Sequence, residues 1–518
     1  MTASTEAEMA RGMPADRSTR RRLNIGKTSV AYPLYIAASI APRAAMFVVL
    51  IVLTRLLPIA EYGLFALVVT TGEIVEISST NWVRVYLLRT EAGAASLKPR
   101  RLGRALVLSA GGALAGLATS AAIAPFISSN RTAEMTIAVG VYIAAFALLR
   151  ITLALLQLSR SHAAYAVLEC GRGASMLAAT VVVALLQPHS FLPTSIALSL
   201  ATGGSATLGL VFVSRHLPRP VLPLGGYLAA IAFGVPYVLS NTLLYTLGWF
   251  DRFIINYYLG PAEVGLYVAA FSLARQPVDL FVGSLNAFTF PMLVHAYANG
   301  GAAKAGPVQS GLLTTMTALG VGIVAALALL GEPIANVLFP PSYSAEIGKL
   351  IPWIALASFM LALKQFVFDN SLHATQRNWL LLFPMVTPAV VSIGCGILLV
   401  RSFGLPGATA NFLMVSMAAM LSTAVLSFRV FVFTIPWRDL AKIVVSALAS
   451  GAAAWAVTAH YGWTPVVGLV MTGLVFCAVY GASLTMAGFS LRRLIETPWA
   501  PLSDRIQEED STSSNIAI

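Results

Sequence analysis

Five ionisable side chains lie in the middle of long apolar stretches, where few other charges occur. Arg43 lies in the first stretch, Glu73 and Glu76 in the second, and Arg275 and Asp279 in a stretch of the second half. A charge at the centre of a bilayer costs about 2.5 to 3.5 kcal/mol on insertion, so each needs a partner, a wet cavity or a function. The two guanidinium groups could hold an anion such as pyrophosphate through paired donors, and the carboxylates could hold the arginines or carry a proton.

The spacing of these charges predicts which of them share a helix face and which of them can pair. Glu73 and Glu76 are three residues apart and share a helix face, whereas Arg275 and Asp279 are four apart and can pair. All five have a similar depth, so we expect the first, second and eighth membrane spans to converge on one central site. Two uses are open and can coexist: a buried charge network that locks the molecule, or a cavity for a charged substrate or coupling ion.

Three more cations could meet an anionic headgroup nearer the cytoplasmic side. Arg84 and Arg89 end the second apolar stretch, and Lys364 lies toward the inner end of the tenth, shortly before Asp369. A topological role or contact with lipid phosphates explains the two arginines equally well. A lysine at this depth can also extend its side chain to the membrane surface.

The elements that position these side chains are membrane-spanning helices. The sequence is 58% hydrophobic and 10% charged, against roughly 25% charged residues in an ordinary soluble domain. Stretches of about 20 apolar residues, enough for one helical crossing, recur along the chain. The hydropathy predicts an all-α integral membrane protein with about fourteen spans, at residues 30–56, 62–86, 102–126, 135–156, 163–186, 192–213, 227–249, 264–293, 311–330, 347–368, 380–400, 405–428, 440–459 and 465–486.

The distribution of Lys and Arg predicts the orientation of these spans. Cations crowd the two tails and every second loop, whereas the other loops hold only Arg55, Arg131, Arg252, Lys349 and Arg401. Because Lys and Arg in short loops stay on the cytoplasmic side, we expect both termini in the cytoplasm. The loops on the opposite side are short, which leaves no room for an external catalytic domain.

A short repeat divides the chain. Ala60–Phe65 reads Ala-Glu-Tyr-Gly-Leu-Phe after the first span, and Ala262–Tyr267 reads Ala-Glu-Val-Gly-Leu-Tyr after the seventh. Their equivalent places in the topology favour a duplicated six-helix unit in parallel orientation over chance, with a substrate cleft between two lobes. We predict a basic tail, two six-helix lobes, two extra helices and a second tail, at residues 1–29, 30–221, 222–434, 435–490 and 491–518.

The sequence shows no recognisable enzyme or cofactor chemistry. Gly26-Lys27-Thr28 looks like the end of a phosphate-binding loop, but the glycine required five positions before Gly26 is Arg21. The six histidines and three cysteines lack the spacing of metal ligands. The net charge of +12 is spread over loops and tails, which argues against nucleic-acid binding. We expect no metal and no ATPase, so proton or sodium coupling, the membrane potential or substrate supply would energise transport.

The run Thr54–Pro58, Thr-Arg-Leu-Leu-Pro, followed by Glu-Tyr-Gly-Leu-Phe at 61–65, resembles the signature of Wzx-type bacterial polysaccharide flippases. These belong to the multidrug, oligosaccharidyl-lipid and polysaccharide (MOP) exporter superfamily. Asp-Arg-Phe at 251–253, Phe-Pro at 290–291 and Phe-Pro-Pro-Ser-Tyr at 339–343 are similar to later landmarks of the family. The resemblance covers the first ten spans, and the last four match only in hydropathy and number.

The resemblance implies a V-shaped, two-lobed transporter that flips an undecaprenyl-pyrophosphate-linked oligosaccharide across the bacterial inner membrane by alternating access. It would serve the synthesis of O-antigen of lipopolysaccharide, capsule or exopolysaccharide, with lipid-linked oligosaccharide, membrane lipid and the polysaccharide polymerase machinery as partners. Cavity arginines of relatives are taken to hold the pyrophosphate, which implies this role for Arg43 and Arg275. The acidic Glu73, Glu76 and Asp279 make this cavity less purely cationic.

Two other functions fit the sequence less well. A cation-coupled multidrug antiporter of the same superfamily should have twelve spans and an acid-dominated cavity, whereas the longer span count and the Arg-Leu-Leu-Pro signature favour the flippase. A membrane-embedded glycosyl polymerase or ligase usually carries a large external loop. The prediction is therefore a transporter and not an enzyme, with the sugar unidentified.

Overall fold

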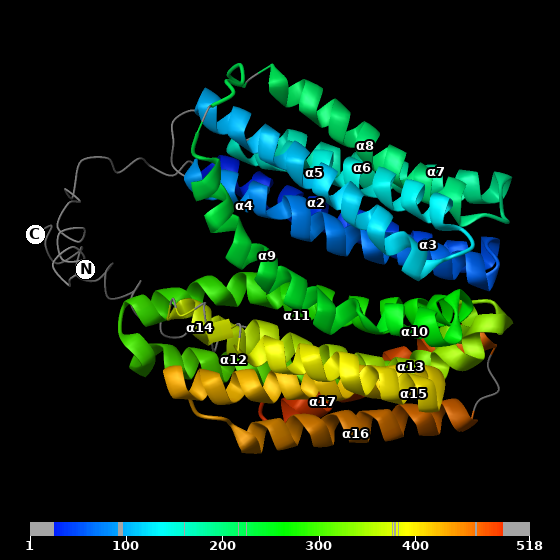
Figure 1. Ribbon diagram of the computed structural model, residues 1–518. Coiled ribbons are helices and arrows are strands. Elements are labelled where there is room, and N and C mark those ends of the chain that lie inside the picture. Colours follow the sequence, from blue (N-terminus) through cyan, green and yellow to red (C-terminus); the bar gives the residue numbers. More distant parts are fainter. Residues whose placement is uncertain are drawn as a thin grey trace, which may run out of the picture.

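The computed structural model describes residues 25–489 except 92–96, 160, 216, 224, 376, 378–379, 382 and 461–463. Every regular element within these ranges is helical (Figure 1). In chain order the elements are α2 (Ile25–Leu56), α3 (Ile59–Glu76), η1 (Ile77–Asn81), α4 (Trp82–Thr90), α5 (Pro99–Ile127), α6 (Thr132–Leu158), α7 (His162–Leu186), α8 (Phe191–Ser214), α9 (Tyr227–Trp249), α10 (Asp251–Leu259), α11 (Pro261–Ala298), α12 (Gly301–Leu338), α13 (Pro341–Leu363), η2 (Lys364–Phe368), α14 (Asp369–Ala374), α15 (Phe383–Val430), α16 (Trp437–His460) and α17 (Pro465–Met486).

These helices trace the fourteen membrane crossings, which confirms the predicted fold class. Eleven helices of the described part are long and apolar enough to span a bilayer. One of them, α15, consists of two spans joined at Gly404, whose φ of 64° lies in the left-handed region that favours glycine. The remaining two crossings are α2 and the consecutive helices α9 and α10.

The helices form two lobes. We call α2 to α8 the N-lobe and α10 to α15 the C-lobe, and α16 and α17 pack against α12 on the side of the C-lobe that faces away from the N-lobe (Figure 1). Each lobe has its own apolar core, which includes Trp82 and Leu155 in the N-lobe and Phe359 and Val367 in the C-lobe. Helix α9 belongs to both, because it packs on α4 of the N-lobe and on α15 of the C-lobe.

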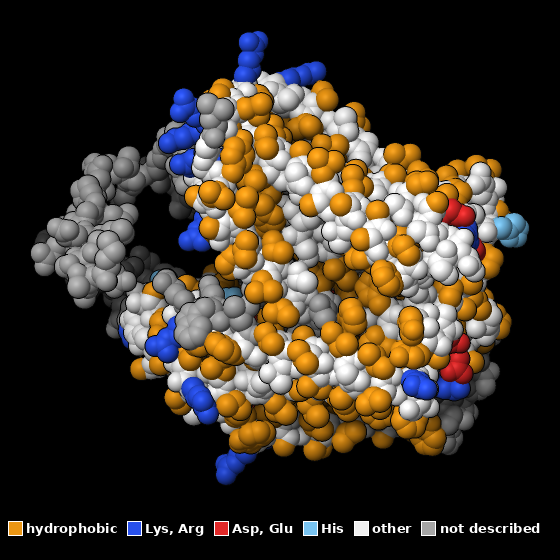
Figure 2. Space-filling view, in the orientation of Figure 1, with side chains coloured by type: hydrophobic (Ala, Val, Ile, Leu, Met, Phe, Trp, Pro, Cys, Tyr) orange, Lys and Arg blue, Asp and Glu red, His pale blue; other side chains and the backbone are white. Residues whose placement is uncertain are grey.

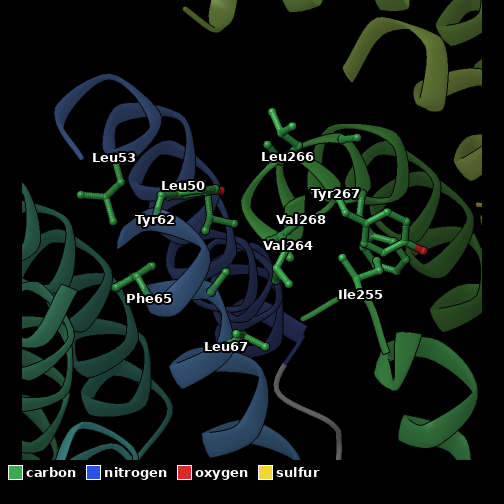
Figure 3. Close-up of a cluster of buried hydrophobic side chains, with 14 of the residues drawn as sticks. Leu50, Leu53, Tyr62, Phe65, Leu67, Ile255, Val264, Leu266, Tyr267 and Val268 are labelled. Atoms are coloured by element: carbon green, nitrogen blue, oxygen red, sulfur yellow. The ribbon is translucent and has the colours of Figure 1, made fainter. Parts of the chain in front are cut away.

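A third apolar core is shared by the two lobes and joins them at one end, which we call the closed end. The cluster of buried side chains in Figure 3 includes Leu53 and Phe65 of the N-lobe and Val264 and Tyr267 of the C-lobe, and all four side chains are fully buried. Apolar packing of this kind, rather than exclusion of water, holds helices together inside a membrane.

The two copies of the sequence repeat meet inside this shared core. Gly63 of α3 lies against the start of α11, so that a Cβ on Gly63 would be 1.7 Å from the carbonyl oxygen of Pro261. Gly265 of α11 lies in the same way against the start of α3, with a Cβ 2.9 Å from the carbonyl oxygen of Ile59. The repeat therefore needs its glycines because the backbones of the two lobes touch there.

Two side chains close to the repeat also cap helices of the opposite lobe. Arg55, at the end of α2, donates from Nε to the carbonyl of Leu338 at 3.1 Å and from Nη2 to that of Val337 at 2.9 Å, at the end of α12. Asn256 of α10 donates to the carbonyl of Ile127 at 2.8 Å, at the end of α5. Because the last carbonyls of a helix lack partners within it, these reciprocal caps stabilise the closed end.

At the other end the lobes diverge (Figure 1), and the surface is indented between them (Figure 2). We call this the divergent end. Lys and Arg side chains gather there (Figure 2). The exposed Arg89, Arg100 and Arg215 lie at the ends of α4, α5 and α8 that point away from the closed end. Helix α9 crosses this end and is attached to the N-lobe, where Asn81 donates to the hydroxyl of Tyr237 at 3.1 Å.

Candidate functional site

Arg275 and Asp279 form the predicted pair on one face of α11. The Nε of Arg275 donates to a carboxylate oxygen of Asp279 at 2.8 Å, and the side chain of Asp279 is 47% exposed. The Nη1 of Arg275 is buried and has no hydrogen-bond partner in the described part of the chain. A guanidinium carries five N–H donors, so the pair leaves donors free for an anion.

Glu73 of α3 lies at the same depth as Arg275. Glu73 is ten residues beyond Gly63, and Arg275 is ten beyond Gly265. Because the helices touch at these glycines and rise about 1.5 Å per residue, both charges lie about 15 Å from the closed end. Glu73 interacts electrostatically with Arg275 and with two arginines described below, yet it forms no hydrogen bond or ion pair with a described residue.

Glu76 is paired inside the N-lobe, with an arginine that the sequence reasoning missed. One carboxylate oxygen of Glu76 accepts from Nε of Arg150 on α6 at 3.2 Å, and the other accepts from the hydroxyl of Thr80 at 2.5 Å. Glu76 is fully buried, and the π-helix η1 begins directly after it. Such irregular turns are frequent at functional sites. The signal that could have found Arg150 is its place inside a predicted apolar span.

We expect Glu76→Gln to destabilise the protein by about 1 to 3 kcal/mol, because the amide keeps the shape but leaves the Arg150 guanidinium without its counter-charge. Thr80→Val is the matched comparison, since it removes one hydrogen bond from the same carboxylate but keeps the ion pair with Arg150, and it should cost about 1.5 to 3 kcal/mol. Thermal unfolding of the detergent-solubilised protein measures both. A stability of Glu76→Gln equal to that of the wild type would show that the pair contributes nothing.

The structure corrects the prediction for Arg252, which the charge pattern placed in a loop. The seventh span continues past Trp249 as α10, and Arg252 near its start is only 7% exposed. Its Nη1 donates to the hydroxyl of Thr70 on α3 at 2.6 Å, from one lobe to the other. Asp251 is also buried, and it accepts from the backbone N–H of Arg252 at 2.9 Å and from the hydroxyl of Tyr267. Hydropathy could not reveal this burial, because the partners come from other helices.

Arg43 has the expected depth, but no hydrogen bond or ion pair joins it to the other four predicted charges within the described ranges. It is thirteen residues from the end of α2 at Leu56, about 20 Å along the helix. Its side chain is exposed and forms no hydrogen bond or ion pair within the described ranges. The neighbouring Ala41 and Pro42 pack against Gly173 of α7, which fixes this part of α2 to the N-lobe.

The three cations expected near the headgroup have different surroundings. Arg84 donates to the side chain of Gln157 at 3.2 Å, and Arg89 is exposed with its guanidinium 5.3 Å from the ring centre of Phe233 on α9. Lys364 is completely buried in the C-lobe and paired with Asp369 at 2.8 Å. In this conformation Lys364 is therefore not accessible to a headgroup.

The charged side chains of the site comprise two ion pairs and two groups without an ion-pair partner among the described residues. Arg150 and Arg275 each pair with a carboxylate, which leaves Arg252 and Glu73 without an opposite charge in contact among the described residues. Within the same ranges, no group of three or more His, Cys, Asp or Glu side chains is placed to hold a metal ion. The arrangement therefore brings arginines and carboxylates of both lobes into electrostatic contact with one another.

The sequence matches one protein family over more than half of its length. The model of the family described as "Polysaccharide biosynthesis protein" matches residues 52–347. This region contains the repeat, the closed end and the four charges Glu73, Arg150, Arg252 and Arg275. No curated protein matches the chain.

Several solved structures share the fold at low identity. The lipid II flippase MurJ in an inward closed conformation is 11% identical, with a TM-score of 0.67 over 86% of this chain and 98% of its own. An inward-facing multidrug resistance transporter of the MATE family, in the MOP superfamily, is 14% identical, with a TM-score of 0.59 over 76% and 97%. A MOP-superfamily transporter from Pyrococcus furiosus, described as having a binding pocket of reverse polarity, is 14% identical, with a TM-score of 0.54 over 77% and 94%.

Proposed function

Because this chain belongs to the polysaccharide biosynthesis protein family and has the fold of MOP-superfamily transporters, we propose that it flips an undecaprenyl-pyrophosphate-linked oligosaccharide across the bacterial inner membrane. The chain is a transporter and not an enzyme. The lipid-linked sugar enters between the lobes at the divergent end and leaves on the other side of the membrane. There it supplies the assembly of a surface polysaccharide.

The observation that carries this proposal is the unsatisfied side of the Arg275 guanidinium. One side of the group pairs with the half-exposed Asp279, and Nη1 on the other side has no partner in the described part of the chain. A pyrophosphate offers several acceptor oxygens, and guanidinium groups bind such oxygens through parallel N–H donors. Each charge-assisted hydrogen bond of this kind contributes about 1.5 to 3 kcal/mol.

The placement of cations supports an orientation with both termini in the cytoplasm. Exposed Lys and Arg side chains gather at the divergent end (Figure 2). At the closed end, Arg131 is bound to Glu61 at 2.5 Å and to Glu134 at 2.6 Å, so this cation is neutralised. Because uncompensated cations stay on the cytoplasmic side, the divergent end faces the cytoplasm in the proposed orientation. In the proposed function, the pyrophosphate-linked sugar is taken up from that side.

Alternating access requires the closed end to open and the divergent end to close. The closed end must part, which separates Gly63 from Pro261 and breaks the caps of Arg55 and Asn256. Proton or sodium coupling at Glu73 would supply the driving force, because this carboxylate has no partner among the described residues and lies between arginines of both lobes.

Deletion of the gene in its host tests the function. We expect complete lipid-linked repeat units to accumulate on the cytoplasmic face, and surface polysaccharide to disappear. Accumulation of finished units on the outer face would instead point to a defect in the polymerase. New sensitivity to cationic dyes without any lipid-linked intermediate would support the multidrug antiporter and contradict the flippase.

Arg275→Gln tests the site directly. The amide can form a neutral hydrogen bond but no ion pair, so we expect binding of undecaprenyl pyrophosphate to purified protein in nanodiscs to weaken about tenfold or more. Lys349→Gln is the matched control, because Lys349 is 71% exposed and pairs only with Glu346 at the protein surface, at 3.0 Å. Equal affinity of Arg275→Gln and the control would remove Arg275 from the site.

A further inference from the structure

The guanidinium of Arg252 is buried with most of its donors unused. The residue is 7% exposed, and its Nη1 hydrogen bond to Thr70 is the one its side chain makes within the described ranges. Its Nε is buried without any partner there, and the oxygens of Asp251 are taken up by a backbone N–H and by the Tyr267 hydroxyl. An unsatisfied buried donor costs about 1 to 3 kcal/mol, more for a charged group, so this geometry needs an explanation.

Phe271 connects this guanidinium to that of Arg275. The guanidinium carbon of Arg252 lies 5.0 Å from the ring centre, and that of Arg275 lies 5.4 Å from it. The two cations are therefore close neighbours on one aromatic side chain. Arg252 is held by Thr70, seven residues beyond Gly63, whereas Arg275 is ten residues beyond Gly265, so Arg252 is anchored nearer to the closed end. Together they form two successive cationic positions between mid-depth and the closed end.

Thr70, which holds the Arg252 guanidinium, belongs to the opposite lobe. It lies on α3, seven residues after Gly63, and is completely buried. When the closed end parts, α3 moves away from α10 and α11, and the hydrogen bond from Arg252 to Thr70 must break. The guanidinium then loses its side-chain partner at the moment when the path to the outer side opens.

We propose that Arg252 is a second anion-binding residue, which receives the pyrophosphate of the substrate from Arg275 as the closed end opens. In the present conformation its guanidinium is masked, because it is buried and hydrogen-bonded to Thr70. The inference rests on the proposed function and adds a step to it. Arg275 binds the anion while the divergent end is accessible, and Arg252 binds it nearer to the outer side once Thr70 has moved away. Because both guanidinium groups contact Phe271, the phosphate oxygens move only a short distance from Arg275 to Arg252.

Two variants separate an anion-binding role of Arg252 from a purely structural one. Arg252→Gln removes the cation, whereas Thr70→Val removes the hydrogen bond that masks it and leaves the cation in place. Each variant is tested for binding of undecaprenyl pyrophosphate in nanodiscs and for polysaccharide export in the deletion strain. The amount of each variant in the membrane fraction is measured by immunoblot.

We expect Arg252→Gln to bind undecaprenyl pyrophosphate within about twofold of the wild type, because Arg252 is masked in the conformation that binds. Its export should fall about tenfold or more, the loss that corresponds to one charge-assisted contact. Thr70→Val should export at least as well as the wild type. Arg252→Lys keeps the charge with fewer donors, so it should recover part of the export, and it replaces Arg252→Gln if that variant does not reach the membrane.

Two outcomes would overturn the proposal. If Thr70→Val loses export as strongly as Arg252→Gln, Arg252 acts only as a lock between the lobes. If Arg252→Gln exports normally, no transfer to Arg252 takes place. If the proposed function itself is wrong, the wild-type protein does not bind undecaprenyl pyrophosphate, and this result distinguishes the two failures.

Discussion

Replacing Gly63 with valine should reduce export to less than about a tenth of the wild-type level while the protein still reaches the membrane. A Cβ at this position would lie 1.7 Å from the carbonyl oxygen of Pro261, and contacts below 3.0 Å essentially never occur. Because the clash is between two helix backbones, no side chain can rotate to relieve it. The lobes must move apart by more than an ångström at the closed end, which prevents the protein from sealing that side.

The separation can be measured through Thr70, which is completely buried in this conformation. Thr70→Cys should react with a membrane-impermeant thiol reagent from outside when Gly63→Val is present, and much more slowly in its absence. The background for this experiment replaces the three native cysteines Cys170, Cys395 and Cys477. Gly111→Val on α5 is the control, since a Cβ there has open space within 4 Å and export should be unchanged. Normal export by Gly63→Val would mean that the lobes tolerate this separation.

Lys364→Ala should lower the free energy of unfolding by about 3 to 5 kcal/mol, the usual cost of removing one partner of a buried ion pair. Lys364 is completely buried, and its ammonium group donates to both oxygens of Asp369, at 2.8 and 3.1 Å. Without it the carboxylate is left in apolar surroundings that include Val367 and Phe368. Thermal unfolding of purified protein in detergent measures the loss.

A double variant shows whether the charge or the packing matters. Lys364→Met combined with Asp369→Leu removes both charges and fills the space, so most of the stability should return. Lys442→Ala is the matched control, because Lys442 is 52% exposed and lies 3.9 Å from Asp439. A surface pair of this kind contributes about 0 to 1 kcal/mol. Equal losses in Lys364→Ala and Lys442→Ala would contradict the role assigned to the buried pair.

The span count and the pair on α11 could be predicted because both depend on local sequence. Hydropathy shows whether a helix lies in lipid or in water. Residues four apart on one helix face, such as Arg275 and Asp279, can pair whatever the surrounding helices are. The two repeated segments were expected in equivalent turns between helices, and the structure places them instead at equivalent positions in the first turns of α3 and α11. Gly63 and Gly265 each contact the backbone of the opposite lobe, which explains why both copies of the repeat have glycine at this position.

The partners of Glu76 and the burial of Arg252 could not be predicted in this way. Arg150 is 74 residues from Glu76, and Thr70 is 182 residues from Arg252. Only the packing of different helices brings these groups together. Arg252 also lies at the end of a hydropathy peak, where an arginine is usually a loop residue that marks topology. The same ambiguity applies to Lys364, which was expected near a membrane surface and is enclosed by the C-lobe.

Glu73 and Arg275 occupy equivalent positions after the two copies of the repeat, which bears on how two such lobes can face each other. Two identical lobes, such as those of an ancestral symmetric dimer, would have set two glutamates or two arginines against each other at this position. Like charges in a medium of low dielectric constant repel strongly. In this chain the position holds one glutamate and one arginine, which attract each other. The two halves are therefore chemically unequal there, so that an anion between them is attracted by Arg275 and repelled by Glu73.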